Sequence, residues 1–484
     1  MAHEAVIGLE CHIQLRTRSK MFCDCPAEFG AEPNTNVCPV CLGLPGALPV
    51  TNRAAIDAAL RLAIALGGAI RERSVFARKN YFYPDMPKNY QITQYDAPLC
   101  EGGALEVRIE GATRRFELIR IHAEEDTGKS FHPERHGDRR VSRVDFNRAG
   151  VPLLELVTQP VFRAPAECAA FLTALRRLVR WLEISDGDME KGHLRCDANV
   201  SVRPAGATTL GTKTELKNLN SIRGVERGIA AEIARQEGVL SGGGRVEQAT
   251  LLYDADHDRL AVMRSKEHAH DYRYFPEPDL PVLVVDAAWI AATRGALPAL
   301  PWAREREFVA LGLPEYDAVV LSEHPDLADY ALEVMAGAEV KLASNWLMTE
   351  VLRVVKERGW TPRDWRARVP AARLVDFLGR VASQSLPGPL AKQVFGWMVE
   401  EPGDVEVLLE RHGARVQSSA DELEPLVRAV LDEHPGPVAQ FLAGKTATLG
   451  FLVGQVMKKS GGQAVPQVVQ ALLKRELESR AARR

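Results

Sequence analysis

Two groups of residues near the start of the chain have the types and spacing that chemistry requires. The first is the segment from Ile7 to Leu15, whose odd positions are apolar. Its even positions after Gly8 are Glu10, His12 and Gln14. Successive side chains of a β-strand point to opposite faces. We therefore expect a carboxylate, an imidazole and an amide to project together from one side of a strand.

Two close pairs of cysteines follow this segment. They are Cys23 and Cys25, then Cys38 and Cys41, with twelve residues between the pairs. Four thiols in two close pairs are typical of a tetrahedral zinc site. The chain has eight cysteines and shows no secretory signal, which favours a reducing, cytoplasmic compartment and metal thiolates over disulfides.

A run of three acidic residues ends the segment 116–125, which alternates like a strand. These residues are Glu124, Glu125 and Asp126. Adjacent carboxylates repel each other unless a cation or solvent compensates them, and Mg²⁺ prefers carboxylate oxygens. A solvated acidic turn would have the same sequence. Alternation places Glu124 on the face of His122 and Glu125 on the other face, so it does not decide which of the two faces the site.

Two later segments, 194–203 and 212–218, alternate in a way that predicts an antiparallel hairpin with one polar face. Most such faces are only solvated. Here the polar positions supply cations for phosphate oxygens and carboxylates for Mg²⁺, the set that a phosphoryl-transfer site needs. They are Arg195, Asp197, Asn199, Ser201 and Arg203 in the first segment, and Lys213, Glu215 and Lys217 in the second.

Other elements must hold these strands in place. A helix is expected from about Ala54 to Leu66, capped by Thr51 or Asn52, and further helices at 165–182 and 223–240. Strands are also expected at 105–109, 141–147 and 153–157. The stretch from Arg78 to Gln91 mixes aromatic residues, prolines and cations without a helical period, which predicts an ordered loop.

The length and composition indicate an ordinary globular protein of two to four domains. The chain has 484 residues, 46% of them apolar and 26% charged, with a net charge of −3. No apolar run is long enough to span a membrane, so no membrane partner is expected. From about Leu297, helical stripes separated by Pro and Gly replace strand alternation. Gly444-Lys445-Thr446 is not a P-loop, because Ala439 stands where the motif needs glycine.

The end of the chain is basic. Residues 445–484 contain eight Lys or Arg and two Glu, which gives this segment a charge of +6. Such a tail is the electrostatic signature of a nucleic-acid partner. A solvated C-terminal helix of a globular protein would have the same composition.

Several long strings in this sequence resemble those of one family, the B subunits of the aspartyl/glutamyl-tRNA amidotransferases (the GatB family). The resemblance spans nearly the whole chain, and its C-terminal part is similar to the YqeY-like tail of that family. It rests on Gly8 to Leu15, the two cysteine pairs, Lys79 to Asp85, Asp145 to Pro152, Leu194 to Asn199, Glu215 to Asn220, Asp271 to Pro278 and Leu449 to Met457.

The resemblance implies an α+β fold in three parts. Residues 1–292 would form an antiparallel-sheet cradle similar to that of glutamine synthetase, with a zinc knuckle. Residues 293–404 would form a helical domain, and residues 405–484 a YqeY-like domain that binds tRNA. This expectation agrees with the predicted hairpin and with the helical texture of the second half of the chain.

The resemblance also implies an activity and partners. An amidase (the GatA partner) and a small third protein (the GatC partner) would complete a heterotrimer. The GatB chain would phosphorylate the side-chain carboxylate of Glu-tRNA(Gln) or Asp-tRNA(Asn) with Mg-ATP, and ammonia from the amidase would displace the phosphate. The chain itself shows no amidase-like serine signature and no obvious glutaminase cysteine. Which of the two tRNA substrates is used does not follow from the sequence.

The family pattern assigns roles to individual residues. Glu10, His12 and Glu125 would bind Mg²⁺, with Asp197 and Glu215 near the same cation. Lys79 and Lys88 would lie at an ammonia-channel mouth or a phosphate pocket. Independently of the family pattern, the predicted hairpin offers Arg195, Lys213 and Lys217 to the phosphates of ATP, and the cysteine spacing offers Cys23, Cys25, Cys38 and Cys41 to zinc.

Two other functions compete with this one. A stand-alone small-molecule ligase of the glutamine-synthetase type would need neither the helical half nor the basic tail. A non-catalytic tRNA-binding scaffold would gain nothing from carboxylates on three strands, because RNA is itself anionic. A Mg²⁺-dependent ATPase that appears only with charged tRNA would separate the amidotransferase from both alternatives.

Overall fold

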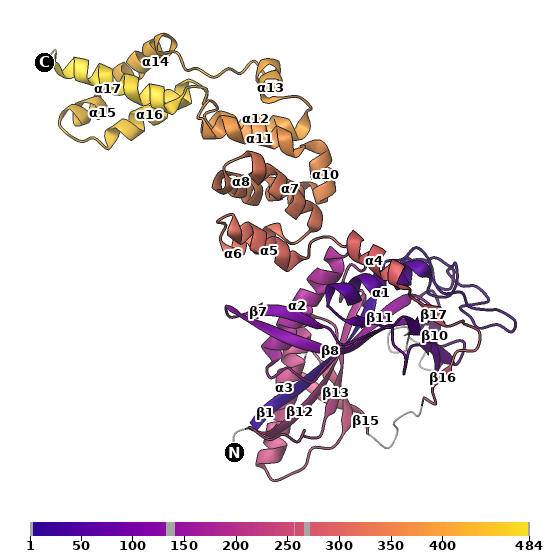
Figure 1. Ribbon diagram of the computed structural model, residues 1–484. Helices are drawn as coiled ribbons and strands as arrows, with labels where there is room; N and C mark the ends of the chain where they lie inside the picture. Colours follow the sequence, from indigo (N-terminus) through magenta and orange to yellow (C-terminus); the bar gives the residue numbers. More distant parts are fainter. Residues whose placement is uncertain (1–2, 132–140, 256, 266–271, 483–484) are drawn as a thin grey trace. The chain divides into compact units, whose positions relative to one another are not determined.

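The computed structural model describes residues 3–131, 141–255, 257–265 and 272–482 (Figure 1). The chain divides into two units, Met1–Leu300 and Pro301–Arg484. The first contains the strands, and the second is helical. The expected boundary between a helical domain and a tail near residue 404 stays a prediction.

One large sheet forms the frame of the N-terminal unit. Its strands lie in the order β15-β14-β13-β12-β1-β11-β8-β6-β2, and β7 pairs with β8 beside this path. All of these neighbours are antiparallel except β13 and β14, which are parallel. The strands are β1 His3–Gln14, β2 Ala69–Ile70, β6 Cys100–Glu101, β7 Ala104–Ile109, β8 Ala112–Glu125, β11 Pro152–Thr158, β12 Leu194–Pro204, β13 Thr214–Leu219, β14 Ala249–Asp254 and β15 Arg259–Ser265.

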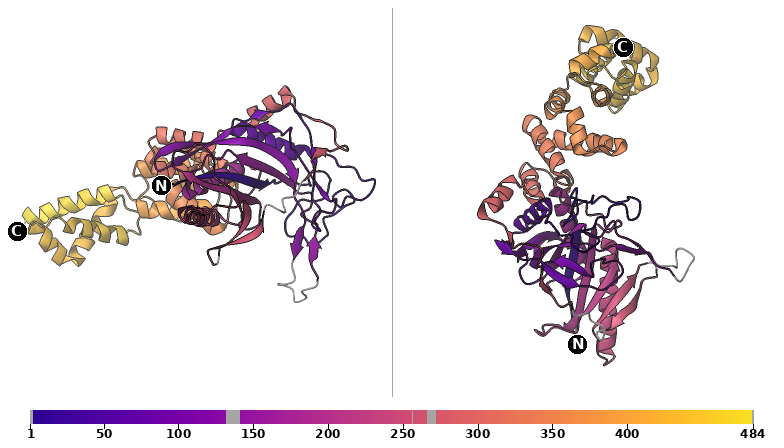
Figure 2. Two further views of the ribbon diagram at one scale, coloured as in Figure 1. Left: turned by 90° about the horizontal axis from the view of Figure 1, so that it is seen from below. Right: turned by 90° about the vertical axis from the view of Figure 1, so that its right-hand side faces the viewer.

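Two long helices cover the apolar face of this sheet. They are α2 (Pro165–Trp181) and α3 (Ile222–Ser241), which pack against each other, with α3 against β12 and β13 (Figures 1 and 2). Cys11 of β1 is fully buried on this face, with its Sγ atom 4.0 Å from that of Cys196 on β12. The opposite face of the central strands carries the polar residues, as the alternation of the sequence predicts.

The predicted helix near residue 54 is confirmed as α1 (Arg53–Ala65). Asn52 is its cap, since its side-chain oxygen accepts hydrogen bonds from the backbone N–H groups of Ala54 (2.9 Å) and Ala55 (3.4 Å). The helix packs against β8, β2 and α4 (Ala287–Ala296).

The stretch from Arg78 to Gln91 differs from the predicted loop at both ends. Residues Ala77–Asn80 form β4 and Tyr90–Thr93 form β5, and the two pair as an antiparallel hairpin around a shorter loop. A third strand, β16 (Phe275–Pro276), pairs with β4. Because this partner lies about 200 residues away in the chain, local periodicity could not reveal the pairing.

Two further two-stranded sheets complete the unit. They are β9 with β10 (Lys129–Phe131 and Arg143–Asp145) and β3 with β17 (Arg73–Ser74 and Leu283–Val284). The strand expected at 141–147 is therefore shorter than predicted.

The second unit confirms the predicted change to helices. Within its described part it holds thirteen α-helices and a π-helical turn at Leu347–Val351. The helices of residues 420–482 enclose a core of their own, which includes Val430, Leu452 and Leu473. The helices are α5 Pro301–Ala310, α6 Glu315–Leu321, α7 Pro325–Gly337, α8 Val340–Trp346, α9 Leu352–Arg358, α10 Pro362–Arg368, α11 Ala371–Ala382, α12 Gly388–Glu400, α13 Val405–Arg411, α14 Ala420–Glu433, α15 Pro435–Leu442, α16 Thr448–Lys459 and α17 Pro466–Ala482. Among the described residues no helix is both long and apolar enough to cross a membrane.

Candidate functional site

Strand register brings polar side chains from four neighbouring strands onto one face of the sheet. Across β1 and β12, His12 lies opposite Arg195, and across β1 and β11 it lies opposite Glu155. Glu155 in turn lies opposite His122 of β8. Directly opposed residues share a face, so these side chains meet although they come from distant parts of the chain.

The centre of this face is a ring of two imidazoles and two carboxylates. The His12 Nε2 atom lies 3.5 Å from a Glu124 oxygen and 3.4 Å from a Glu155 oxygen. The His122 Nε2 atom makes the matching contacts, at 3.5 Å to Glu124 and 3.4 Å to Glu155. Only His12 is substantially open to solvent, with 24% of its side chain exposed, so the ring is approached from the side of β1.

The histidines and glutamates of the ring stabilise each other's charged forms. Burial by itself would lower the pKa of His122, but the carboxylates of Glu155 and Glu124 outweigh it and raise that pKa to about 9. The pKa of His12 is raised in the same way. Burial would raise the pKa values of Glu124 and Glu155, yet the two imidazoles lower both of them, that of Glu155 well below its ordinary value. Groups whose pKa values are shifted by burial and by specific charged partners are common at functional sites.

The ring also fits a divalent cation. One ligand atom each from His12, Glu124 and Glu155 lies within 4.8 Å of the others. Carboxylate oxygens with one imidazole suit Mg²⁺ or a similar ion. Displacement of the protons by a cation would leave the two carboxylates compensated.

Glu125 lies on the opposite face of β8 from this ring. Its carboxylate forms a buried ion pair with Lys88 and accepts a hydrogen bond from the Ile92 backbone N–H at 2.9 Å. The structure therefore brings together His12 and Glu124, and it does not bring Glu125 to them. The predicted roles of Glu125 in Mg²⁺ binding and of Lys88 in phosphate binding stay untested.

Glu10 lies one step along β1 from the ring. Its carboxylate accepts a hydrogen bond from the Asn199 side-chain amide at 2.8 Å. Burial, and to a lesser extent the charge of Glu155, raises the pKa of Glu10. Glu10 is also directly opposite Asp197, so the carboxylate face continues from β1 onto β12.

The hairpin charges are paired with one another. The Lys217 Nζ atom lies 2.6 Å from an Asp197 oxygen and 2.9 Å from a Glu215 oxygen. Burial would lower the pKa of Lys217, but these two carboxylates outweigh it and raise that pKa. The predicted polar face is thus present, and its Lys217 is paired with Asp197 and Glu215. Lys213 lies just before β13 and is exposed to solvent.

Two further cations border the ring. Arg195 donates to Asp126 at 2.8 Å, and that carboxylate raises the pKa of the guanidinium. Lys79 of β4 lies 4.9 Å from the centre of the Tyr272 ring. Burial would lower the pKa of Lys79, but Glu124 and other nearby groups raise it. The adjoining Asp271 lies outside the described residues.

Sequence reasoning missed Glu155. Its signal was present, because a single carboxylate interrupts the apolar strand Leu153 to Val157. An acidic residue in a buried strand needs a partner. Only the register of β11 between β1 and β8 identifies the two histidines as those partners.

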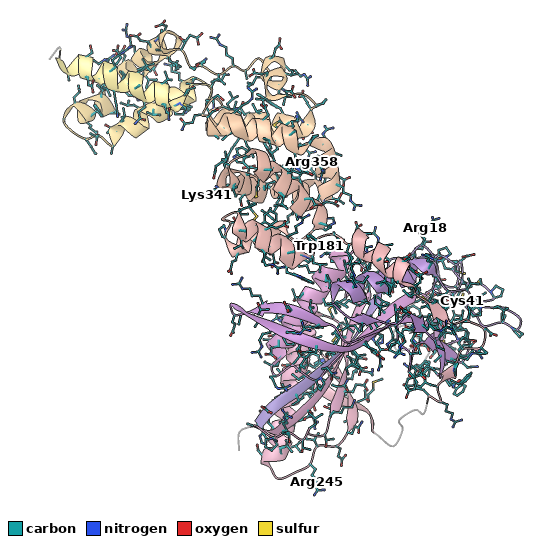
Figure 3. The ribbon with its side chains drawn as sticks, viewed as in Figure 1. Arg18, Cys41, Trp181, Arg245, Lys341 and Arg358 are labelled. Carbon is teal, nitrogen blue, oxygen red and sulfur yellow. The ribbon has the colours of Figure 1, made fainter. Side chains whose placement is uncertain are left out.

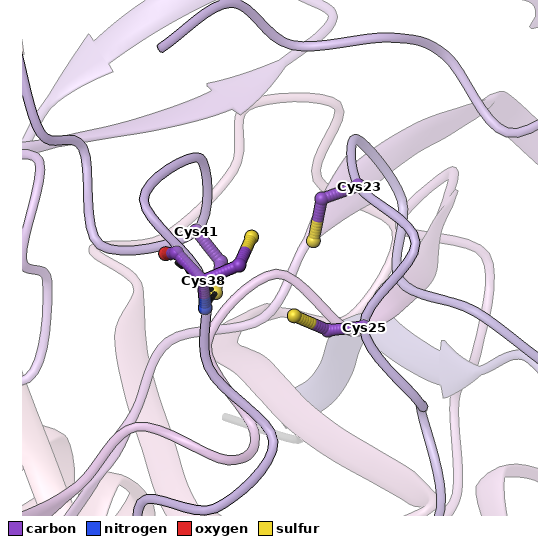
Figure 4. A group of neighbouring side chains, drawn as sticks. All are labelled: Cys23, Cys25, Cys38 and Cys41. Atoms are coloured by element: carbon purple, nitrogen blue, oxygen red, sulfur yellow. Dashed lines mark hydrogen bonds between the residues drawn. The ribbon is translucent and has the colours of Figure 1, made fainter.

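The four predicted zinc ligands lie together in a separate knuckle (Figure 4). Their sulfur atoms all lie within 4.8 Å of one another. The hydrogen bond from the Cys23 thiol lowers the pKa of Cys41 to about 4, helped by the Cys38 N–H group and the charge of Lys20. Lys20 is fully buried, and its Nζ atom lies 3.7 Å from the Cys41 sulfur. Four thiols beside a buried cation fit a zinc ion, whose tetrathiolate site carries excess negative charge.

A second stretch of the chain clamps this knuckle to the sheet unit. The Asp145 side chain accepts a hydrogen bond from the Asn34 backbone N–H at 3.0 Å. The Asn147 amide donates to the Glu32 carbonyl at 2.6 Å and accepts from the Asn36 N–H at 2.8 Å. The motif that begins at Asp145 therefore has a structural explanation.

The fold and the site define a class of protein: a sheet domain with one charged face, followed in the chain by an all-helical region. Residues 5–291 match the GatB/GatE catalytic domain, and residues 330–477 match the GatB domain. The chain belongs to the GatB family, which confirms the resemblance seen in the sequence.

Relatives match over their whole length. The B subunit of the aspartyl/glutamyl-tRNA(Asn/Gln) amidotransferase of Moorella thermoacetica is 49% identical over 479 residues, which are 99% of this chain and 100% of the relative. The proteins of the same name from Halorhodospira halophila and Chlorobium chlorochromatii are 47% and 46% identical, again over 99% of this chain and 100% of each relative.

Proposed function

We propose that this chain activates a carboxylate within a tRNA-dependent amidotransferase. It uses ATP to phosphorylate the side-chain carboxylate of Glu-tRNA(Gln), Asp-tRNA(Asn) or both, and ammonia then displaces phosphate to give the amide. The chain is one component of a glutamine-dependent ligase, as its family membership indicates. The observation that carries the finer proposal is the ring of His12, His122, Glu124 and Glu155 on the polar face of the sheet, bordered by cations.

The chemistry explains why such a face is needed. A carboxylate is a poor electrophile, and phosphorylation gives it a leaving group. The transferred phosphoryl group carries negative charge, so catalysis depends on positioning and on charge compensation. Lys79 and Arg195 border the ring and would orient phosphate oxygens through their N–H groups. The acyl phosphate would hydrolyse in water, so the site must admit ammonia and exclude solvent.

We assign the cation of this reaction to His12, Glu124 and Glu155. A bound Mg²⁺ would offset the negative charge of the phosphate oxygens. The proposal is supported by the spacing of the three ligand groups. Glu10, Asp197 and Glu215 would hold the neighbouring polar face in order through Asn199 and Lys217.

The remaining parts of the proposal concern the knuckle and the partners. Zinc would be held by Cys23, Cys25, Cys38 and Cys41, where it would fix the loop beside the sheet. An amidase of the GatA type would supply ammonia from glutamine, and a small GatC protein would complete a heterotrimer. The relatives are named as B subunits, which supports the need for partners.

The test is the reaction itself. The chain is co-purified with its amidase and its small partner and given Mg-ATP, glutamine and Glu-tRNA(Gln) or Asp-tRNA(Asn). Amino acids are then released from the tRNA and separated. We expect glutamine or asparagine on the tRNA only when ATP and all three proteins are present. Tight tRNA binding without any amide product would instead support a scaffold.

A further inference from the structure

A groove beside the zinc knuckle is not used by the chemistry described above. On one side of Phe29 lies a cavity of about 460 Å³, lined by Gln14, Arg16, Arg18 and His193 among others. On its other side lies a cavity of about 170 Å³, lined by Gln14, Lys129 and Lys191 among others. The two cavities share Gln14, Ala27, Glu28 and Phe29, so they form one groove with Phe29 at its middle.

Phe29 is unusually exposed for its size. Its side chain is 64% exposed, and one edge of the ring packs against the His193 ring with centroids 5.3 Å apart and planes at 82°. Isolated exposed apolar residues are common on protein surfaces. Phe29 differs because it stands between two cavities and is held in position by a buried histidine. Its ring is therefore available as a stacking surface.

The groove also carries exposed basic side chains. Arg16 and Arg18 are exposed, and neither has a carboxylate partner among the described residues (Arg18 is labelled in Figure 3). The acids of the first cavity are Glu28 and Asp186, and Asp186 is engaged with His193. Basic side chains next to an exposed aromatic ring are the combination that binds single-stranded nucleic acid.

His193 adds an unsatisfied polar atom to the same cavity. Its Nδ1 atom lies 2.9 Å from both oxygens of Asp186. Its Nε2 atom is buried and has no hydrogen-bond partner within the described parts of the chain. A buried polar atom without a partner at a cavity wall calls for a ligand group, such as a ribose hydroxyl or a phosphate oxygen.

The groove leads to the reacting face. Gln14 lines both cavities and lies two residues beyond His12 on the same face of β1. Two residues of strand span about 7 Å. An amino acid esterified to the last ribose of a strand in this groove would therefore come close to the ring of histidines and carboxylates.

We propose that this groove binds the unpaired 3′ end of the aminoacyl-tRNA, with a base stacked on Phe29 and phosphates at Arg16 and Arg18. The proposal rests on the proposed function, since it places the tRNA substrate of that same site. It assigns Phe29, Arg16 and Arg18 as binding residues and gives them no part in phosphoryl transfer.

The test compares intact tRNA with tRNA that lacks its last three nucleotides, using the complete complex with all its partners. Wild type should bind the shortened tRNA more weakly. The Phe29→Ala variant should bind intact tRNA about 5- to 150-fold more weakly, the range expected for loss of one stacked base. It should also lose most of its response to shortening. Phe29→Trp should retain both properties, whereas Phe29→Leu should not.

Charge is tested separately. Each of Arg16→Ala and Arg18→Ala should make the salt dependence of intact-tRNA binding less steep, by about 0.7 in the slope of log affinity against log salt for each lost contact. Arg245→Ala is the matched control, because Arg245 is exposed and lies at the opposite end of the N-terminal unit from Arg18 (Figure 3). The control should leave both the salt dependence and the response to shortening unchanged.

The outcomes separate this inference from the proposed function. If wild type forms no amide on the tRNA, the proposed function fails. If the wild type is active but the Phe29→Ala variant responds to shortening as the wild type does, and the two Arg variants keep the wild-type salt dependence, only the groove assignment is overturned. If these variants raised the KM for ATP and kept the wild-type response to shortening, the result would indicate that the groove binds ATP and not the tRNA end. If these variants lost the partner proteins on purification, the result would indicate that the groove is an interface between proteins. Each of these last two results would also overturn the assignment.

Discussion

At the scale of single residues, the two neighbouring glutamates Glu124 and Glu125 have different charged partners. Glu124 shares its carboxylate with two histidines, and Glu125 pairs with Lys88 on the other side of β8. Family resemblance assigns the cation to Glu125, and the geometry favours Glu124. The two assignments predict different phenotypes.

We expect Glu124→Gln to weaken cation binding by more than about 10-fold, because it removes a ligand charge. Glu125→Gln should act mainly on stability. It leaves the buried Lys88 without its partner, which costs about 3–5 kcal/mol when a buried pair is broken. Calorimetric Mg²⁺ binding and thermal unfolding of both variants would check this. Normal unfolding of Glu125→Gln with lost Mg²⁺ binding would restore the assignment from resemblance.

The raised pKa of His122 predicts how metal-free protein responds to pH. A folded pKa of about 9 lies above the value of about 6.5 in the unfolded chain. The stabilisation is therefore complete below about pH 6.5 and is lost as the pH rises through 9. Its size is on the order of 3 kcal/mol.

We expect chelator-treated protein to lose stability between about pH 6.5 and pH 9, measured by denaturant unfolding. His122→Gln should flatten this part of the profile. A variant profile that falls as steeply as that of the wild type would show that another group titrates.

At the scale of elements, the knuckle is held by two independent devices. One is the set of four thiols, and the other is the clamp from Asp145 and Asn147 to the loop at residues 32–36. Removal of each device should therefore have a different result.

We expect Cys38→Ala to lose bound zinc and to expose residues 23–41 to protease. Asn147→Ala should retain zinc while it increases cleavage of the same loop. Cys100→Ala is the control, because Cys100 is buried in β6, outside the set of four clustered thiols. Metal analysis and limited proteolysis are the measurements. Full zinc content in Cys38→Ala would rule out the four-thiol site.

Deletion of residues 445–484 would change both the charge and the folding of the helical tail. Removing residues 445–484 should weaken tRNA binding and its salt dependence if the tail is a phosphate contact. However, α16 and α17 carry core residues such as Leu452, Val456 and Leu473. The deletion would therefore also remove part of the core that these helices share with α14, so point substitutions are needed to separate charge from folding.

At the scale of the whole molecule, the basic excess of the tail is partly neutralised within the fold. Lys459, Arg475 and Arg480 pair with Glu433, Glu424 and Asp432. All three acids belong to α14, which precedes the basic segment 445–484 in the chain. A polyanion that approached the tail would therefore meet fewer unpaired cations than the composition suggests.

We expect Lys445→Ala, Lys458→Ala and Lys474→Ala together to reduce the salt dependence of tRNA binding by about 0.9 in slope for each lost contact. These three lysines are exposed and have no ion-pair partner among the described residues. Alanine at Lys459, Arg475 and Arg480 is the matched set and should change the slope less. Equal slopes for both sets and wild type would show that the tail does not contact phosphates.

The sequence by itself determined the features that depend on local spacing. Alternation along β1 put Glu10 and His12 on one face, and the spacing of Cys23 to Cys41 identified four thiols that the structure brings together. Apolar periodicity and the positions of Pro and Gly identified the helical second half. These patterns are fixed by strand and helix geometry within one segment.

Only the tertiary structure decided which distant segments meet. The register of β11 between β1 and β8 brought Glu155 to His12 and His122 and placed Glu124 with them. The pairing of Lys88 with Glu125, and of the tail cations with α14, arose in the same way. The physical reason is that contacts between elements depend on strand order and register, and these are set by packing of residues that lie far apart in the chain.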